Sequence, residues 1–295
     1  MAVKNPHFYF PFNFGALPHE LADYGKSKVV VLPVPYDATT SYKPGTRDGA
    51  HAIINASRFL EFYDEEAKKN FSEIGICTLD EMEIVDDAKG TIDRVYEAAK
   101  TILGDNKNFV MLGGEHSLTS GAVRAFKEKF SDLSVLHIDA HADMADLNGE
   151  SKWDHGCVAR RCYEMCPVVL AGIRSLGDEQ ARFIEENGIP TYYAHEIFCS
   201  GGDAWMDEAI SKLSDTVYLT IDLDALDPSI MPSVGTPVPG GFRWFTLLKL
   251  LRKLAASKKV VGFDVMEFMP IPGMHAPDFT AAKLVYKLIG EFYCK

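Results

Sequence analysis

Carboxylates and imidazoles stand directly after several short apolar runs of this 295-residue chain. Three of the runs are followed by residues that commonly bind metals: Asp139, His141 and Asp143 after one, Asp222 and Asp224 after another, and His116 after a third. Alternate residues of an extended chain point to the same side, so the members of each group can face one cleft. Oxygen and nitrogen donors without a thiolate suit Mn²⁺ better than a structural zinc ion.

The number of these groups is what predicts a metal centre. A lone Asp-x-Asp is common in loops, and a lone buried histidine is more often a core residue. Four carboxylates and two imidazoles gathered in one place, however, carry a large burial cost unless cations neutralise them. Two divalent cations roughly 3.5–4 Å apart can share a bridging water and convert it to hydroxide near neutral pH.

The elements that must position these groups alternate along the chain. Apolar, β-branched runs predict strands at residues 29–34, 109–112, 134–138, 168–171, 217–221 and 260–265. Amphipathic patterns between and after them predict helices at residues 91–103, 118–130, 178–187, 204–213, 246–256 and 281–292, with Gly188 as a helix C-cap. This alternation indicates a parallel sheet with both faces covered by helices. Ligands bind beyond the carboxyl ends of such strands, where the candidate residues lie.

Four stretches resemble the signatures of the ureohydrolase family, which contains the arginases and agmatinases. They are GGEHS (113–117), DAHAD (139–143), TIDLDALDPSIMPSVGTPVPGG (220–241) and GFDVMEFMP (262–270). A fifth, SYKPGTRDGAHAI (41–53), resembles the early segment of agmatinases. The match runs in the family's order from about residue 28 to the C-terminus. It implies an arginase-like, three-layer αβα fold with a mostly parallel central sheet of about eight strands.

The resemblance also implies roles for single residues. One Mn²⁺ would be held by His116, Asp139, Asp143 and Asp222, and the other by Asp139, His141, Asp222 and Asp224, with Asp139 and Asp222 bridging. A bridging hydroxide would attack the guanidinium carbon, and Asp143 would deliver a proton to the departing amine. Glu267 would bind the guanidinium through a bidentate contact, and His155 would shuttle protons.

Spacing alone does not distinguish the remaining candidates. His155 by itself would be interpreted as a surface histidine, and only the resemblance gives it a catalytic role. Asp264 is interpreted as a supporting or structural residue, and His137, inside an apolar run, as a core histidine with its hydrogen bonds satisfied. Residues 235–241 form a glycine- and proline-rich loop that either shapes the substrate mouth or simply leads into a helix.

Substrate choice within the family depends on loops. Arginases carry an asparagine two residues after the metal motif, where this chain has Ala145, so arginine is disfavoured and agmatine is the expected substrate. N1-aminopropylagmatine would fit a site that is open at its far end. Lys152, in the mouth segment 144–154, could instead pair with a carboxylate such as that of 4-guanidinobutanoate, although a solvated surface lysine is its simpler interpretation.

Two other kinds of protein fit these signatures less well. A silent relative that binds a polyamine or a protein would typically lack a metal ligand, and all six positions are filled here. A related deacetylase-type enzyme would carry a different Asp/His arrangement and a single zinc.

Composition bounds the setting in which such an enzyme would work. A net charge of -12 disfavours nucleic acid as a partner and mildly favours small cationic ligands. The chain has no apolar run long enough for a membrane span, no signal-peptide stretch, and six cysteines without a Cys-x-x-Cys pair. A cytoplasmic protein with reduced thiols is therefore expected. We expect one domain over residues 1–295, with residues 1–27 as an N-terminal arm. The resemblance implies a homo-oligomer, a trimer or a hexamer.

Overall fold

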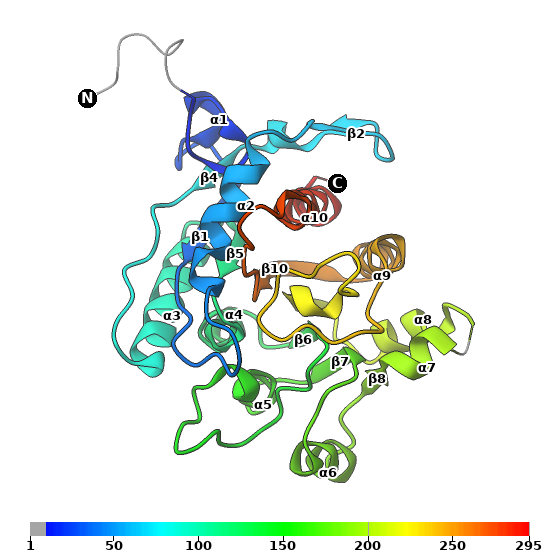
Figure 1. The fold of residues 1–295 in the computed structure, drawn as a ribbon. Coiled ribbons are helices and arrows are strands. Elements are labelled where there is room, and N and C mark those ends of the chain that lie inside the picture. Colours follow the sequence, from blue (N-terminus) through cyan, green and yellow to red (C-terminus); the bar gives the residue numbers. More distant parts are fainter. Residues whose placement is uncertain (1–9, 200, 295) are drawn as a thin grey trace.

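A single parallel sheet organises the structure, a computed structural model that describes residues 10–199 and 201–294 (Figure 1). Its strands lie in the order β4 (Ile76–Thr78), β1 (Val29–Val34), β5 (Asn108–Gly113), β10 (Lys259–Met266), β9 (Thr216–Asp222), β6 (Leu133–Ile138), β7 (Val168–Ile173) and β8 (Thr191–Tyr193). All neighbouring strands pair in parallel. The predicted sheet of about eight mostly parallel strands is confirmed.

Helices cover both faces of this sheet. They are α1 (His19–Ala22), α2 (Gly49–Ser57), α3 (Ala88–Gly104), α4 (Thr119–Lys129), α5 (Val158–Tyr163), α6 (Asp178–Glu186), α7 (Ala194–Cys199), α8 (Ala204–Ser211), α9 (Trp244–Ser257) and α10 (His275–Tyr293). A small hairpin of β2 (Tyr63–Asp64) and β3 (Lys69–Asn70) stands apart from the sheet.

Two apolar cores divide the molecule into three layers. Alternate residues of β1 belong to different cores: Val29 is in the core that contains buried residues of α2, α9 and α10, whereas Val30 is in the core that contains buried residues of α3, α4 and α5. Because successive side chains of a strand point to opposite faces, the sheet must lie between two helical layers. This confirms the expected αβα arrangement and explains why the predicted strands are apolar throughout.

The six predicted strands all form, and their helical partners form within a few residues of the predicted bounds, apart from α10, which begins six residues earlier than expected. Gly188 has the positive φ of 60° that a helix C-cap requires. The prediction missed the short edge strands β4 and β8 and the helices α1, α2, α5 and α7. Apart from α2, which has nine residues, these pieces have three to six residues and are too short to show a clear period.

The part of the predicted N-terminal arm that the structure describes, residues 10–27, is packed on the body. Phe14 is fully buried, and its backbone N–H donates to Thr78 Oγ1. The backbone N–H of Gly15 donates to Ser57 Oγ on α2. Residues 1–9 of the arm lie outside the described residues.

Two further expectations can be compared with the fold. Every one of the six cysteines is free, as expected for reduced thiols. None of the helices in residues 10–199 and 201–294 has the length and apolar character needed to cross a membrane.

Candidate active site

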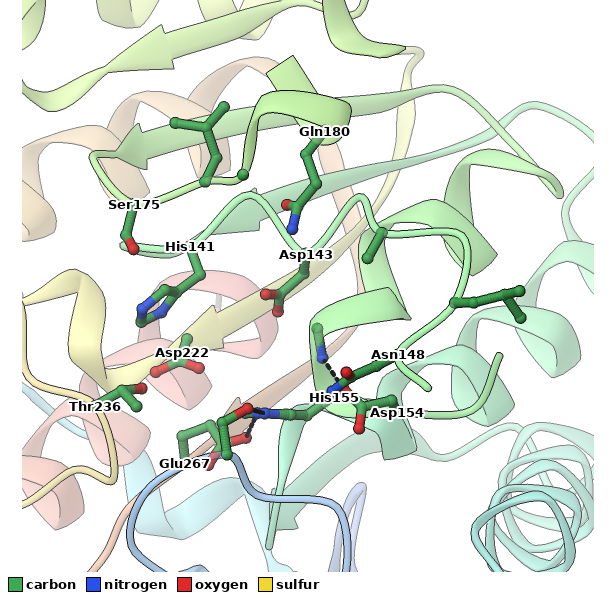
Figure 2. A pocket seen from close by; sticks show the side chains of 16 residues that line it. His141, Asp143, Asn148, Asp154, His155, Ser175, Gln180, Asp222, Thr236 and Glu267 are labelled. Carbon is green, nitrogen blue, oxygen red and sulfur yellow. Dashed lines mark hydrogen bonds and ion pairs between the residues drawn. The ribbon is translucent and has the colours of Figure 1, made fainter. Parts of the chain in front are cut away.

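Four adjacent strands bring the candidate residues together. The strands β5, β10, β9 and β6 are neighbours at the centre of the sheet, and all four end at the same edge. His116 follows β5, Glu267 follows β10, and the two other groups lie at or just beyond the ends of β9 and β6. In Figure 2, His141, Asp143 and Asp222 point into a common space, with Glu267 and His155 across from them.

The first potential metal group surrounds His116. His116, Asp139 and Asp143, together with His137, can place one ligand atom each within 4.8 Å of the others. The Nδ1 atom of His116 lies 3.1 Å from Asp139 Oδ2 and 3.6 Å from Asp143 Oδ2. These side chains are buried, and His116 and Asp139 are completely so.

The second group shares Asp139 with the first and adds His141 and Asp224. His141 Nδ1 lies 2.8 Å from Asp224 Oδ2 and 3.7 Å from Asp139 Oδ1. The backbone N–H of His141 also donates to Asp139 Oδ1, which fixes that carboxylate between the two groups. A carboxylate in this position could contact a cation on either side.

Asp222 joins the two groups through different contacts. Its Oδ2 lies 3.3 Å from His116 Nδ1, and its Oδ1 accepts a 2.7 Å hydrogen bond from the backbone N–H of Asp224. Asp222 is not a member of either group with ligand atoms within 4.8 Å of each other, although it lies against the first.

Buried polar atoms without a hydrogen-bond partner indicate whether these residues could bind a cation. His116 Nδ1 and Asp139 Oδ2 are buried without a hydrogen-bond partner within the described part of the chain. Such orphaned atoms are rare in folded proteins and need an explanation. Divalent cations between the imidazoles and carboxylates would satisfy both atoms.

The pKa values of the buried carboxylates also indicate a cation site. Burial, reinforced by the charge of Asp139, raises the pKa of Asp143 to about 8. Burial and the neighbouring Asp224 and Asp139 raise the pKa of Asp222 well above its ordinary value. Carboxylates crowded in this way disfavour their own ionised forms, and a bound cation reverses that preference. The residues therefore fit a divalent metal centre.

His137 requires a correction to the sequence analysis. It is buried as expected, but neither ring nitrogen makes a hydrogen bond within the described residues, so it is not a satisfied core histidine. Its Nε2 lies 2.9 Å from Asp139 Oδ2, and its ring stacks on that of His116 at 4.7 Å. The signal was available in the sequence, because His137 obeys the same alternate spacing as Asp139 and His141.

The backbone of the site is strained at two of the predicted catalytic residues. Asp143 and Glu267 have positive φ angles of 49° and 62°, a backbone conformation that residues other than glycine rarely adopt. Such strain persists only where the surroundings impose it, and it concentrates at functional sites. Gly114 provides part of that framework, since a Cβ atom there would lie 2.0 Å from the Tyr36 carbonyl oxygen.

Glu267 and His155 are directly linked. Glu267 Oε1 accepts a 2.8 Å hydrogen bond from the backbone N–H of His116 and lies 3.3 Å from His155 Nδ1. The other ring nitrogen, His155 Nε2, lies 2.8 Å from Ser41 Oγ. Burial lowers the pKa of His155, but Glu267, Asp143 and Asp154 outweigh it and raise the pKa to about 9.

A buried carboxylate that the sequence analysis did not single out supports this arrangement. Glu115 accepts hydrogen bonds of 2.6 Å from both the backbone N–H and the hydroxyl of Thr39, and one of 2.5 Å from Ser117 Oγ. Thr39 Oγ1 in turn accepts from the backbone N–H of His155. Burial raises the pKa of Glu115 to about 7. Glu115 thus ties the segment around Thr39 and Ser41 to His155.

These side chains line one cavity of about 460 Å³. Its lining includes the acidic residues Asp143, Asp154, Asp222 and Glu267, the histidines His141 and His155, and no lysine or arginine from the described part of the chain. Thr236 also lines it, so the loop at residues 235–241 contributes to the mouth. The cavity is therefore suited to a cationic guest.

Comparison with known proteins identifies the group of enzymes to which this site corresponds. The arginase family model matches residues 27–290 of the chain. This chain belongs to the arginase family. Among its relatives, the N(1)-aminopropylagmatine ureohydrolase of Synechocystis sp. is 39% identical over 281 residues, which cover 92% of this chain and 90% of the relative. The agmatinase of Pyrococcus horikoshii is 35% identical over 272 residues, which cover 91% and 92%.

A solved structure shows the same fold. The agmatine ureohydrolase of Thermoplasma volcanium aligns with a TM-score of 0.87 at 29% sequence identity, over 97% of this chain and 95% of that one. The family and its fold, which the sequence motifs suggested, are therefore confirmed, and members of the arginase family depend on metal.

Within this arginase-family site, Lys152 stands apart from the other candidates. Its Nζ lies 3.9 Å from Asp146 Oδ1, and its side chain is 53% exposed. It is not among the residues that line the cavity. The simpler of its two interpretations, a solvated surface lysine, agrees with this position.

Proposed function

We propose that this chain hydrolyses the guanidinium group of agmatine, releasing urea and putrescine, with two Mn²⁺ ions at the centre described above. The observation that carries the proposal is the pair of His/Asp groups that share the buried Asp139, whose Oδ2 has no hydrogen-bond partner among the described residues, with His141 and Asp143 lining the same acidic cavity as Glu267. Family membership supplies the reaction class.

The ligand set that the family resemblance implies is supported by the two groups and by the contact of Asp222 with His116, and we propose it without His137. His116, Asp139, Asp143 and Asp222 would hold one ion, and His141 and Asp224 would hold the other together with Asp139 and Asp222. Oxygen and imidazole donors suit Mn²⁺. When bound, the pair would supply a water activated for attack on the guanidinium carbon.

The chain's own residues would orient the substrate. Glu267 is held by the His116 N–H and by His155 through Oε1, while no side-chain contact within the described residues uses its Oε2. That oxygen is available to accept N–H bonds from a guanidinium ion. A charge-assisted contact of this kind would fix the planar group in the cavity, which accelerates a reaction by positioning alone.

Two residues would move protons. Asp143 lines the cavity beside the proposed ions, so its carboxylate can take up a proton from the attacking water and release it to a departing amine. His155 lies between Glu267 and the hydroxyl of Ser41, which gives its ring a partner on both nitrogens. We propose that His155 exchanges protons between the cavity and the solvent side.

The charge of the cavity supports agmatine over substrates that end in a carboxylate. Arginine and 4-guanidinobutanoate would bring a negative charge to a cavity lined by acidic residues and lacking a lysine or arginine among the described lining residues. Agmatine ends in an ammonium group, which the same surroundings attract. The side chain of Ala145, which lines the cavity, has no polar atom for a carboxylate where arginases have asparagine.

N1-aminopropylagmatine is the second candidate. The relative from Synechocystis that covers most of this chain is named for that substrate. It carries the same guanidinium group on a longer cationic chain, so it would use the same metal centre and Glu267. Its extra length would extend toward the exposed residues Leu147 and Asn148 at the mouth.

A urea-release assay with the Mn²⁺-loaded protein tests the proposal. Agmatine, N1-aminopropylagmatine, 4-guanidinobutanoate and arginine are compared by kcat/KM. We expect both cationic amines to be turned over and both carboxylates to be poor substrates. Arginine as the best substrate would contradict the substrate assignment. Binding of agmatine without urea release would favour the silent polyamine-binding alternative.

The oligomeric state is a separate proposal. We propose a homo-oligomer, a trimer or a hexamer, by analogy with the family alone. Light scattering of the purified protein would test it, and a monomeric mass at working concentrations would contradict it.

A further inference from the structure

A second row of polar residues lies beneath His116, on the side away from the cavity. His116 Nε2 lies 2.7 Å from Thr220 Oγ1, and Thr220 Oγ1 lies 2.5 Å from Asp264 Oδ1. The other oxygen of Asp264 accepts hydrogen bonds from Tyr218 OH at 2.7 Å and from Thr119 Oγ1 at 2.9 Å. All of these groups are fully buried.

The number of protons available determines which group donates and which accepts in each of these hydrogen bonds. A threonine hydroxyl has one proton, and an ionised carboxylate can only accept. Asp264 accepts from three hydroxyl groups, one at Oδ1 and two at Oδ2, and this arrangement of donors favours its ionised form. Thr220 therefore donates its proton to Asp264. Its oxygen is left to accept a proton from His116 Nε2.

We infer that Thr220 and Asp264 are positioning residues that keep a proton on Nε2 of His116, so that the lone pair on Nδ1 is available to a divalent cation. This inference rests on the proposed metal centre. The second nitrogen of a metal-binding histidine usually has such a partner, which fixes both the tautomer and the ring orientation. Here the partner is a hydroxyl, and the carboxylate acts through it.

The row acts on only one of the two groups. Among the contacts within the described residues, Thr220 and Asp264 reach His116 but not His141, which instead pairs with Asp224 and is 25% exposed. Disturbing Thr220 should therefore weaken the ion held by His116 and leave the other in place. This asymmetry separates a positioning role from general damage to the core.

The experiment follows Mn²⁺ retention by the full-length loaded protein. Wild type, Thr220→Val, Thr220→Ser and Thr119→Val are equilibrated in chelator buffers of decreasing free Mn²⁺, and bound manganese per chain is measured. Thr220→Val should lose one of its two ions at about 10–100-fold higher free Mn²⁺ than wild type. Its electron paramagnetic resonance spectrum should change from a coupled pair to a single ion.

Two variants serve as controls. Thr220→Ser restores the hydroxyl and should retain both ions as wild type does. Thr119→Val makes the same isosteric change at a fully buried residue that donates to Asp264 and lies 3.4 Å from Thr220 Oγ1 but has no hydrogen bond to His116 in the described structure. Thr220 keeps its contacts with His116 Nε2 and Asp264 Oδ1 in this variant, so both ions should be retained. Asp264→Ala keeps the Thr220 hydroxyl but removes its acceptor, and it should show the same loss as Thr220→Val even if the latter does not fold.

The outcomes distinguish the inference from the proposed function. Retention of both ions by Thr220→Val, an equal weakening of both ions, or an effect of Thr119→Val as large as that of Thr220→Val would overturn the inference. A wild-type protein that never binds two ions would overturn the proposed metal centre itself.

Discussion

The cluster of proposed metal ligands and the segment at the substrate mouth are held in place by different kinds of contact. In the cluster, His116 and Asp139 are completely buried, and Asp222 and Asp224 are nearly so. Each stands at or just beyond the end of a central strand, and hydrogen bonds join His116 to Thr220 on β9 and the backbone N–H of Ala140 to Asp224. The mouth segment, residues 144–154, includes Leu147 with 48% exposure and has neither helix nor strand.

The mouth keeps its shape through a few contacts. Asn148 and Ser151 exchange backbone hydrogen bonds, Met144 N donates to Gln180 Oε1, and Asp146 pairs with Arg161. A rigid centre beside a loop of this kind is how one fold can keep its chemistry while its substrate changes. Substitutions in the cluster should therefore affect turnover greatly, whereas those in the mouth should affect the choice of substrate.

The largest effect is expected for Asp143→Asn, which tests the buried side of the comparison. An amide cannot take up and release the proton that Asp143 is proposed to deliver, so kcat should fall about 10²–10⁴-fold. Urea release gives the rate, while circular dichroism and bound manganese show whether fold and metal survive. Near-normal turnover in a fully loaded variant would remove Asp143 from proton delivery.

The cluster could be predicted from the sequence because its residues stand where central strands end. Asp139, His141 and Asp143 follow β6, which ends at Ile138, and a parallel sheet brings all its carboxyl ends to one edge. The apolar runs identified β5, β6, β9 and β10, so their convergence followed. Glu267 also follows a predicted strand, at residues 260–265, and the resemblance assigned its role and that of His155.

Residues that depend on loops or on three-dimensional packing could not be predicted. Glu115 was not singled out, because its partner Thr39 lies 76 positions away in a segment without periodic structure. His137 is a different case: its alternate spacing with Asp139 and His141 was visible in the sequence, but its stacking on His116 follows only from the placement of β5 and β6 in one sheet. Hydrogen bonds across such distances in sequence carry no local pattern.

His155 lies between the buried cluster and the mouth, and the pH dependence of the free energy of unfolding tests its contact with Glu267. In the metal-free protein its pKa is raised from 6.5 to about 9, because the nearby carboxylates outweigh burial. The stabilisation is thus fully present below pH 6.5 and is lost as the pH rises through about 9, by about 3 kcal/mol. Urea unfolding of His155→Gln should lack this component of the decline.

The matched control for this measurement is His51→Gln. His51 has a side chain with 60% exposure and lies outside the cavity, so its replacement should leave the pH dependence of wild type intact. If His155→Gln declines between pH 6 and pH 9.5 as steeply as wild type, His155 is not held in its protonated form by Glu267.

A smaller effect is expected for Glu267→Gln, which separates substrate binding from the metal cluster. The amide oxygen can still accept from the His116 N–H, so the fold and both ions should be retained. Loss of the charge on the guanidinium contact should lower kcat/KM for agmatine about 10–100-fold. A loss of bound manganese in this variant would show that Glu267 supports the cluster rather than the substrate.

The smallest effect is expected for Lys152→Ala, on the exposed side of the comparison. Lys152 pairs with Asp146 at 3.9 Å and is half exposed, and exposed ion pairs contribute little. We expect kcat/KM for agmatine to change by less than about twofold. Rates for 4-guanidinobutanoate should also stay as low as in wild type. A selective loss of 4-guanidinobutanoate turnover would instead place Lys152 at the far end of the substrate, and the mouth would then carry a cationic contact that its lining lacks.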